Sequence, residues 1–221
     1  MPEVLKIDSE KPEPDLIDRA VRILKTGGII AFPTETFYGL AADAANPEAV
    51  ERIFRIKGRH FNNPIALIIG REEHLYDLAE DVPDTGRRMI RIFWPGPLTL
   101  LFKASPRIIP KLTAHTGKIG IRISSHPVAA CLADLLGGPI TATSANLSGK
   151  PENRSPHEVV QCLGDLVDLV IDGGLSPGGK GSTILDVTGH PPVAVREGAI
   201  SMDLIQEKLL SIAADARHLK S

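Results

Sequence analysis

Hydrophobic positions along the chain alternate between helical spacing and short unbroken runs. Residues 15–26 carry apolar side chains every three or four positions, which predicts an amphipathic helix that ends at Gly27-Gly28. The apolar run at 29–32 follows directly and predicts a buried strand. Residues 46–57 begin with Asn-Pro-Glu, which predicts a helix because Asn caps the first amides and Pro suits the first turn. Gly58 marks the expected end of that helix.

The same two patterns continue through the rest of the chain, without an internal repeat or a low-complexity linker. Further strands are predicted at 65–69, 98–103, 119–123, 140–143, 169–171, 184–187 and 193–195. Further helices are predicted at 72–79, 84–93, 127–136, 156–163 and 200–214. Strands separated by helices favour an α/β sheet, and we expect a mixed sheet because the late strands follow one another closely.

Composition narrows the class of protein. The 221 residues are 43% hydrophobic and 24% charged, so the chain has enough apolar side chains for a full core. This balance excludes disorder, collagen and coiled coil as descriptions of the whole chain. The net charge of -2 gives no general reason to expect nucleic-acid binding, so any such surface must arise from local clustering.

The chain ends and the cysteines bear on localisation. No apolar run approaches the roughly 20 residues needed to cross a bilayer, and the charged start of the chain shows no cleavable signal peptide. Cys131 and Cys162 lie inside apolar helical patterns without disulfide or zinc spacing. We therefore expect buried thiols, a cytoplasmic protein and no membrane partner.

Three polar segments could carry chemistry. Residues 32–40, Phe-Pro-Thr-Glu-Thr-Phe-Tyr-Gly-Leu, form a hydroxyl-rich turn directly after a predicted strand, where α/β proteins place ligands. Lys57-Gly58-Arg59 brings two cations to a helix end that leads to Asn63-Pro64, and both cations suit phosphate. Each segment also has a purely structural explanation, because turn hydroxyls bond local backbone and cations favour helix C-termini. These two segments alone leave both interpretations open.

The third segment favours a functional role on its own. Residues 141–149, Thr-Ala-Thr-Ser-Ala-Asn-Leu-Ser-Gly, crowd hydroxyls and an amide among small residues that permit close approach of a ligand. Residues 174–181 are close to a phosphate-binding P-loop, but Gly181 replaces the required Ser or Thr after Lys180, and a strand follows instead of a helix. We therefore exclude a P-loop NTPase. No His pair has metal spacing, and no metal ligand is identified.

Taken together, these segments resemble the YrdC family of L-threonylcarbamoyladenylate synthases. The resemblance covers roughly residues 17–199 and rests on the order and spacing of several motifs. Besides those above, they are Trp-Pro-Gly-Pro-Leu-Thr at 94–99, Ile-Arg-Ile at 121–123, His126-Pro127, Gly-Ser-Thr-Ile-Leu-Asp at 181–186 and Arg-Glu-Gly at 196–198. The sequence departs from many relatives at His60, Phe61 and Thr143, and by a two-residue insertion at Glu152-Asn153.

The resemblance implies a fold and a reaction. The fold would be a single YrdC-like domain over residues 1–221, with a core at about 17–199 and a C-terminal helix at about 200–214. Its twisted mixed sheet, flanked by helices, would curve around a large cavity. The reaction would join L-threonine, bicarbonate and ATP into threonylcarbamoyl-adenylate and release pyrophosphate, with magnesium on the phosphates. A threonylcarbamoyl transferase complex would use the product to modify adenosine 37 of ANN-decoding tRNAs.

Within that reaction, site residues can be assigned by charge and hydrogen-bonding capacity. The residues expected to bind ATP are Lys57, Arg59, Asn63, Thr143, Ser144, Asn146 and Arg196. Those expected to bind threonine are Thr34, Arg122, Thr141 and Ser182. The glycine-rich segment 173–181, which carries Lys180, is expected to be a mobile flap over the substrates.

Two other functions fit parts of the same sequence. A module that binds double-stranded RNA or tRNA would use Lys57 and Arg59 as backbone contacts. A carbamoyl-adenylating enzyme with a different acceptor would resemble the YrdC-like module of hydrogenase-maturation proteins, but the Cys pairs of their zinc fingers are absent here. Pyrophosphate release from ATP that depends on threonine and bicarbonate distinguishes threonylcarbamoyl-adenylate synthesis from RNA binding.

Overall fold

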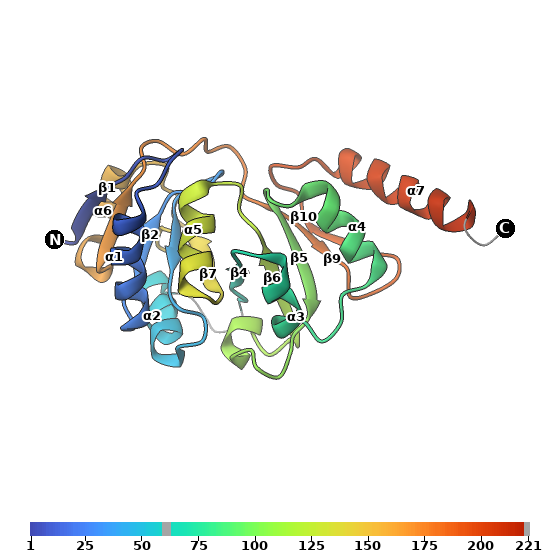
Figure 1. Cartoon of the computed structure of the whole chain (residues 1–221), viewed down its shortest axis with the longest axis horizontal. Helices are drawn as coiled ribbons and strands as arrows, with labels where there is room; N and C mark the ends of the chain where they lie inside the picture. The colour runs from blue at the N-terminus through green and yellow to red at the C-terminus, as the bar shows by residue number, and fades with distance from the viewer. Residues whose placement is uncertain (59–62, 219–221) are drawn as a thin grey trace.

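A computed structural model describes residues 1–58 and 63–218, with side chains described to residue 211 (Figure 1). Ten strands form one sheet in the order β1-β8-β2-β3-β7-β4-β6-β5-β9-β10. Their bounds are β1 Glu3–Lys6, β2 Ile30–Phe32, β3 Gly39–Ala41, β4 Ala66–Ile68, β5 Leu98–Lys103, β6 Lys118–Arg122, β7 Ile140–Ser144, β8 Leu169–Asp172, β9 Thr183–Asp186 and β10 Val193–Arg196. Pairings of both senses occur, so the expected mixed α/β sheet is confirmed.

Seven α-helices accompany the strands in the part of the chain that the structure describes. They are α1 Pro14–Lys25, α2 Pro47–Lys57, α3 Leu75–Leu78, α4 Asp84–Phe93, α5 Pro127–Leu136, α6 Pro156–Leu163 and α7 Met202–His218. Single 3-10 turns lie at Glu72–His74, Pro110–Thr113 and Gly164–Leu166. None of the described helices is long and apolar enough to span a bilayer.

Side chains from the two faces of the sheet pack into separate clusters. Strand β2 shows the division, because alternate positions of a strand point to opposite faces. Ile30 and Phe32 lie in a cluster with residues of α1 and α5, which pack against each other on one face. Ala31 lies in the other cluster, which includes residues of α2 and α4. The sheet therefore forms the centre of the molecule, with helices over both of its faces (Figure 1).

The chain crosses the molecule between β8 and β9. Strand β8 pairs with β1 and β2 near one end of the sheet, whereas β9 pairs with β5 and β10 near the other. Residues 173–182 connect them, and Figure 1 shows this connection passing along one edge of the molecule. Its length therefore follows from the distance between two strands that are not neighbours. A glycine-rich turn between adjacent strands is not what the structure shows.

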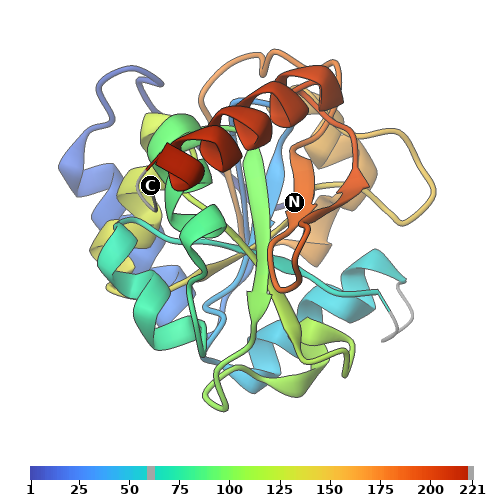
Figure 2. The same ribbon diagram turned by 90° about the vertical axis from the view of Figure 1, so that its right-hand side faces the viewer.

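Helix α7 and strand β10 lie at the end of the molecule that carries the last strands (Figure 2). Helix α7 packs on α4, and β10 pairs with β9 alone and forms the edge of the sheet. The C-terminal helix expected at 200–214 is thus present, beginning at Met202 and continuing to His218.

One expectation about the cysteines is wrong. Cys131 is exposed and Cys162 is only partly buried, although both lie in helices as expected. On α5 the buried positions are Val128, Ala129, Leu132 and Ala133. Cys131 lies on the other side of the helix from these four residues, so its side chain points outward.

Candidate active site

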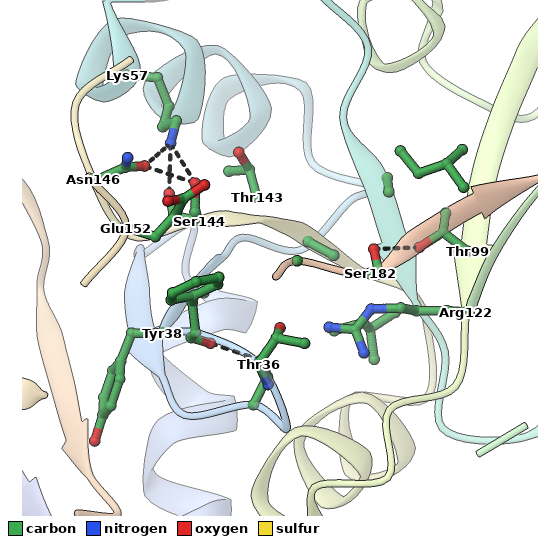
Figure 3. Close-up of a pocket in the computed structure, with 18 of the residues that line it drawn as sticks. Thr36, Tyr38, Lys57, Thr99, Arg122, Thr143, Ser144, Asn146, Glu152 and Ser182 are labelled. Atoms are coloured by element: carbon green, nitrogen blue, oxygen red, sulfur yellow. Dashed lines mark hydrogen bonds between the residues drawn. The ribbon is translucent and has the colours of Figure 1, made fainter. Parts of the chain in front are cut away.

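A cavity of about 560 Å³ lies against one part of the sheet (Figure 3). Its walls come from the turn between β2 and β3, the end of α2, strands β4 and β7, the loop after β7, and the start of β9. Arg196 at the end of β10 and Arg122 at the end of β6 complete it. Segments far apart in sequence thus meet in one concave site with a largely polar lining. Concave sites are typical of small-molecule binding.

The hydroxyl-rich turn at 33–38 joins the antiparallel strands β2 and β3 and lines the cavity. Thr34 is 2% exposed, and its Oγ1 donates to the carbonyl of Phe37 at 2.7 Å and lies 3.1 Å from Thr36 Oγ1. The turn hydroxyls therefore satisfy local backbone while they also line the cavity. The structural interpretation of this segment is confirmed, and its functional interpretation stays a prediction that its place at the cavity supports.

Lys57 is brought against the segment that follows β7. Helix α2 ends at Lys57 because Gly58 adopts a left-handed conformation with φ of 56°. Lys57 is 4% exposed, and its Nζ donates to Ser144 O and to Asn146 Oδ1, each at 2.6 Å. The same ammonium lies 3.3 Å from Ser144 Oγ. A buried cation and the polar segment 144–146 thus form one cluster at the cavity wall.

Asn146 is held firmly within this cluster. Its Oδ1 also accepts a hydrogen bond from Ser144 Oγ at 2.7 Å, and its Nδ2 donates to the carbonyl of Lys150 at 2.5 Å. Thr143, Ser144 and Asn63 line the cavity beside it. Of the predicted ATP-binding residues, Arg59 lies outside the described residues, and the structure brings the others to this cavity.

Arg122 stands at the opposite side of the cavity in Figure 3, with its guanidinium pointing into the open space. Its Nη1 forms an ion pair with Glu35, whose side chain is 13% exposed. Glu35 follows Thr34 in the β2–β3 turn, so this turn contributes to the site from two positions. Sequence reasoning missed Glu35, and its only signal was an acid between two threonines.

Ser182 and Arg196 form a third group. Ser182 Oγ lies 2.9 Å from Thr99 Oγ1, and Arg196 Nη2 donates to the Ser182 carbonyl at 2.7 Å. Burial, and less strongly the charge of Arg122, lower the pKa of Arg196 from its usual value, whereas Glu152 opposes the shift. Arg196 is an exposed residue overall, and its guanidinium sits among other charges at the cavity.

Thr141 and Lys180 lie elsewhere. Thr141 is fully buried, and its Oγ1 accepts from the amide of Ala42 at 2.9 Å and donates to Leu40 O at 3.0 Å. Its hydroxyl is engaged with neighbouring backbone in the sheet and is not part of the cavity wall, which corrects its assignment to threonine. Lys180 is exposed, pairs with Glu197 at 2.6 Å and does not line the cavity either.

Sequence reasoning missed several lining residues. Thr36, Thr99, Ser148, Lys150 and Glu152 all face the cavity. Glu152 is the single acid among the lining residues that the structure describes, against the cations Lys57, Arg122, Lys150 and Arg196. Within the same part of the chain, no group of three or more His, Cys, Asp or Glu side chains could hold a metal ion by itself. The site is therefore cationic, which suits anionic ligands.

Known proteins share both sequence and fold with this chain. The Sua5/YciO/YrdC family model, described as telomere recombination, matches residues 22–198. The threonylcarbamoyl-AMP synthase of Pyrococcus abyssi is 38% identical over 188 residues, which cover 85% of this chain and 55% of that protein. The threonylcarbamoyl-AMP synthase of Bacillus subtilis is 37% identical over 200 residues, which cover 90% and 58%.

A solved structure extends this likeness to three dimensions. The crystal structure of P. abyssi Sua5 complexed with L-threonine matches with a TM-score of 0.89 at 36% identity, covering 93% of this chain and 60% of that one. The chain spans a little over half the length of the curated relatives in P. abyssi and B. subtilis.

Proposed function

The chain belongs to the Sua5/YciO/YrdC family, and from that membership we propose that it makes threonylcarbamoyl-adenylate from L-threonine, bicarbonate and ATP and releases pyrophosphate. It would then be a nucleotidyltransferase. One observation carries the proposal: Lys57, Arg122 and Arg196 converge on a single cavity among hydroxyl and amide groups. Such a set suits substrates that bring a triphosphate and a carboxylate together, because cations bind these anions with charge-assisted hydrogen bonds.

Different walls of the cavity suit different substrates, one wall ATP and the other threonine. Lys57, Ser144 and Asn146 supply an ammonium, a hydroxyl and an amide close together, which suits the phosphates and ribose of ATP. Asn63, Thr143 and Arg196 line the same cavity and would extend the nucleotide site. Arg122, Thr34 and Ser182 face the remaining space and would hold the threonine. Both substrates would then meet within one enclosure.

The chemistry requires positioning more than a protein nucleophile. The threonine amine, in its neutral form, attacks carbon dioxide and loses a proton, or attacks bicarbonate with release of water, and either way becomes a carbamate. The carbamate oxygen then attacks the α-phosphorus of ATP with pyrophosphate as leaving group. Cations fixed around the phosphates stabilise the charge that develops on the departing oxygens. Holding both reactants in one cavity converts encounters between separate molecules into a step within one complex.

Magnesium fits this site as a companion of ATP. Mg²⁺ is commonly held by substrate phosphates with one or two carboxylates and several waters. Glu152 is the carboxylate available among the described lining residues, and it lies in the loop after β7 beside the nucleotide wall. Bound there, the ion would neutralise phosphate charge, and Glu152 would be the side chain that holds it.

The product defines the partners. A mixed anhydride of a carbamate and AMP is reactive, so a second enzyme must accept it; we infer a threonylcarbamoyl transferase complex that modifies adenosine 37 of ANN-decoding tRNAs. Both this enzyme and the tRNA would act downstream, in the cytoplasm. The two other functions weighed from the sequence, an RNA-binding module and an adenylating enzyme with another acceptor, find no separate support in the described cavity.

Substrate dependence tests the proposal. Pyrophosphate release is measured with ATP alone, with each pair of substrates, and with ATP, threonine and bicarbonate together. The proposal predicts release only with all three, and a strong decrease when valine replaces threonine, because a site that hydrogen-bonds a hydroxyl rejects analogues without one. Release that is independent of threonine or bicarbonate would contradict it.

A further inference from the structure

The β2–β3 turn contacts the end of β6 through Glu35. Both oxygens of this carboxylate accept hydrogen bonds: Oε1 from Arg122 Nη1 and Oε2 from the hydroxyl of Ser124. Ser124 is 1% exposed, and its Oγ also accepts from the amide of His126 at 3.2 Å. The carboxylate is thus fixed by two donors, 87 and 89 residues away in sequence.

Stability alone is a poor explanation for this arrangement. The side chains of Arg122 and Glu35 are only 6% and 13% exposed. Removing two charges from water costs about as much as their attraction returns, and apolar residues of similar size often do as well. A buried ion pair at the edge of a binding cavity therefore calls for a reason connected with the cavity.

The geometry supplies that reason. A guanidinium has five N–H donors in one plane, so fixing one edge on a carboxylate fixes the direction of the others. Arg122 pairs with Glu35 through Nη1, while its guanidinium points into the cavity (Figure 3). Glu35 does not itself line the cavity. Arg122 is the hydrogen-bonded partner of Glu35 that lines the cavity, so it links this carboxylate to a ligand there.

We propose that Glu35, held by Ser124, is a positioning residue that presents Arg122 to the carboxylate of the amino-acid substrate. The inference rests on the proposed function and assigns one recognition step within it. The substrate carboxylate would meet a guanidinium that is already oriented, so little side-chain entropy is lost on binding. The charge of Glu35 also offsets that of Arg122, which suits a zwitterionic amino acid better than a multiply charged phosphate.

The experiment compares binding of L-threonine and threoninamide, which lacks the carboxylate, by calorimetry to the wild-type chain, Glu35→Gln and Ser124→Ala. Wild type is expected to prefer threonine by about tenfold or more, the size of one charge-assisted contact. In Glu35→Gln this preference should fall to about twofold, with ATP affinity unchanged. Ser124→Ala should lower the preference by a smaller factor. A general structural role would weaken both ligands equally and leave the preference intact.

Glu51→Gln is the matched control. It makes the same chemical change in another ion pair, with Lys111, at a residue that does not line the cavity. It should retain the wild-type preference. If Glu35→Gln and Ser124→Ala both keep that preference, the inference is wrong while the proposed function stands. If wild type fails to bind threonine, the proposed function itself fails and this inference with it. Should Glu35→Gln not fold, Ser124→Ala alone decides.

Discussion

At the scale of single residues, Lys57 has a structural role, to which our proposal adds the binding of ATP phosphates. It ends α2, it is buried, and its ammonium contacts the Ser144 carbonyl and the Asn146 side chain. Burial lowers the effective dielectric around a charge, which strengthens its attraction for a phosphate. The same burial makes the residue sensitive to substitution, because its loss removes the hydrogen bonds that the ammonium donates to Ser144 O and Asn146 Oδ1.

Lys57→Ala should weaken ATP binding by roughly ten- to a hundredfold, since one charge-assisted contact is worth about 1.5–3 kcal/mol. Calorimetric titration with ATP measures the change directly. Lys208→Ala on α7 is the control, because Lys208 pairs with its neighbour Glu207 away from the cavity. ATP affinity equal to that of the control would remove Lys57 from the nucleotide site.

Glu152 allows a second prediction, on magnesium. In the wild-type chain, ATP affinity should rise when magnesium is added. Glu152→Gln should reduce this rise several-fold, and in the absence of magnesium it should bind ATP more tightly, because a carboxylate repels the phosphates. ATP titrations with and without magnesium measure both effects. An unchanged magnesium dependence in Glu152→Gln would show that this carboxylate does not hold the ion.

The sequence predicted which side chains line the cavity where charged and hydroxyl residues cluster in short segments. Cations and hydroxyls near Lys57 and Ser144 pointed correctly to one cavity. Thr141 could not be separated from Thr143 by this reasoning, since both belong to the same polar run. Which neighbours each side chain meets depends on the strand register: Thr141 pairs with Leu67, while its hydroxyl bonds the backbone of β3. The register is set by packing between strands that are far apart in sequence, so local patterns do not show it.

At the scale of elements, the sequence predicted helices and strands best where local capping residues and hydrophobic spacing mark their ends. Helices at 84–93, 127–136 and 156–163 and the strand at 98–103 have the predicted bounds. Ser155 shows why, because it forms a capping box with Glu158 that fixes where α6 begins. Strands β1 and β3 were missed. Strand β1 has only two apolar residues, Val4 and Leu5, between two charged ones, and β3 is a three-residue strand of Gly, Leu and Ala, so neither shows a strand pattern.

The sequence predicts a mobile flap over residues 173–181, and the hydrogen bonds of this connection limit the mobile part to fewer residues. Its amides at Ser176 and Gly178 donate to Arg154 O at 2.8 Å and to Thr36 O at 2.7 Å, and Tyr38 Oη donates to the carbonyl of Gly174. These bonds hold the first part of the connection against the walls of the cavity. Movement would then be confined to residues 179–181, just before Ser182.

Hydrogen exchange distinguishes the two parts. Without ligands, the amides of Ser176 and Gly178 should exchange slowly, because they are bonded, and those of 179–181 should exchange faster. Adding ATP and threonine should slow exchange at 179–181 only. Rapid exchange over the whole of 173–181 in the free protein would favour the longer flap and contradict this division.

Helix α5 provides a pH-dependent element. His126 caps the helix by accepting the Val128 amide on Nδ1 at 3.2 Å. Burial lowers the pKa of His126, although Glu35 and Glu10 oppose the shift. The folded chain therefore favours the neutral imidazole, and stability from this residue is present above the unfolded pKa of about 6.5 and is lost as pH falls through the folded pKa.

His126→Asn tests that cap, because Asn caps helices well and does not titrate in this range. Urea unfolding of both chains is measured at about pH 7.5 and at about pH 5. These values lie above and below the pKa of a free histidine side chain, which is about 6.5. The fall in unfolding free energy on acidification should be smaller for His126→Asn. An equal fall in the two chains would mean that His126 is uninvolved.

At the scale of the whole molecule, the cavity depends on the sheet order. Strand β7, which leads into Ser144, is separated from β9, which follows Ser182, by β4, β6 and β5. Residues of both strands nevertheless line one cavity. Sequence patterns indicated strands and helices, but not which strands are neighbours, because pairing is set by packing across the whole sheet. The resemblance to a family implied a twisted mixed sheet around a large cavity, and the strand order itself comes from the structure.

The most direct test of the central claim follows carbon from bicarbonate into the product. The chain is incubated with ATP, L-threonine and isotopically labelled bicarbonate, and the nucleotide fraction is analysed by mass spectrometry. The account predicts an adenylate whose mass equals AMP joined to threonine through a labelled carbonyl, formed in step with pyrophosphate and greatly reduced in Lys57→Ala. An adenylate without the label, or pyrophosphate release without any labelled adenylate, would contradict it.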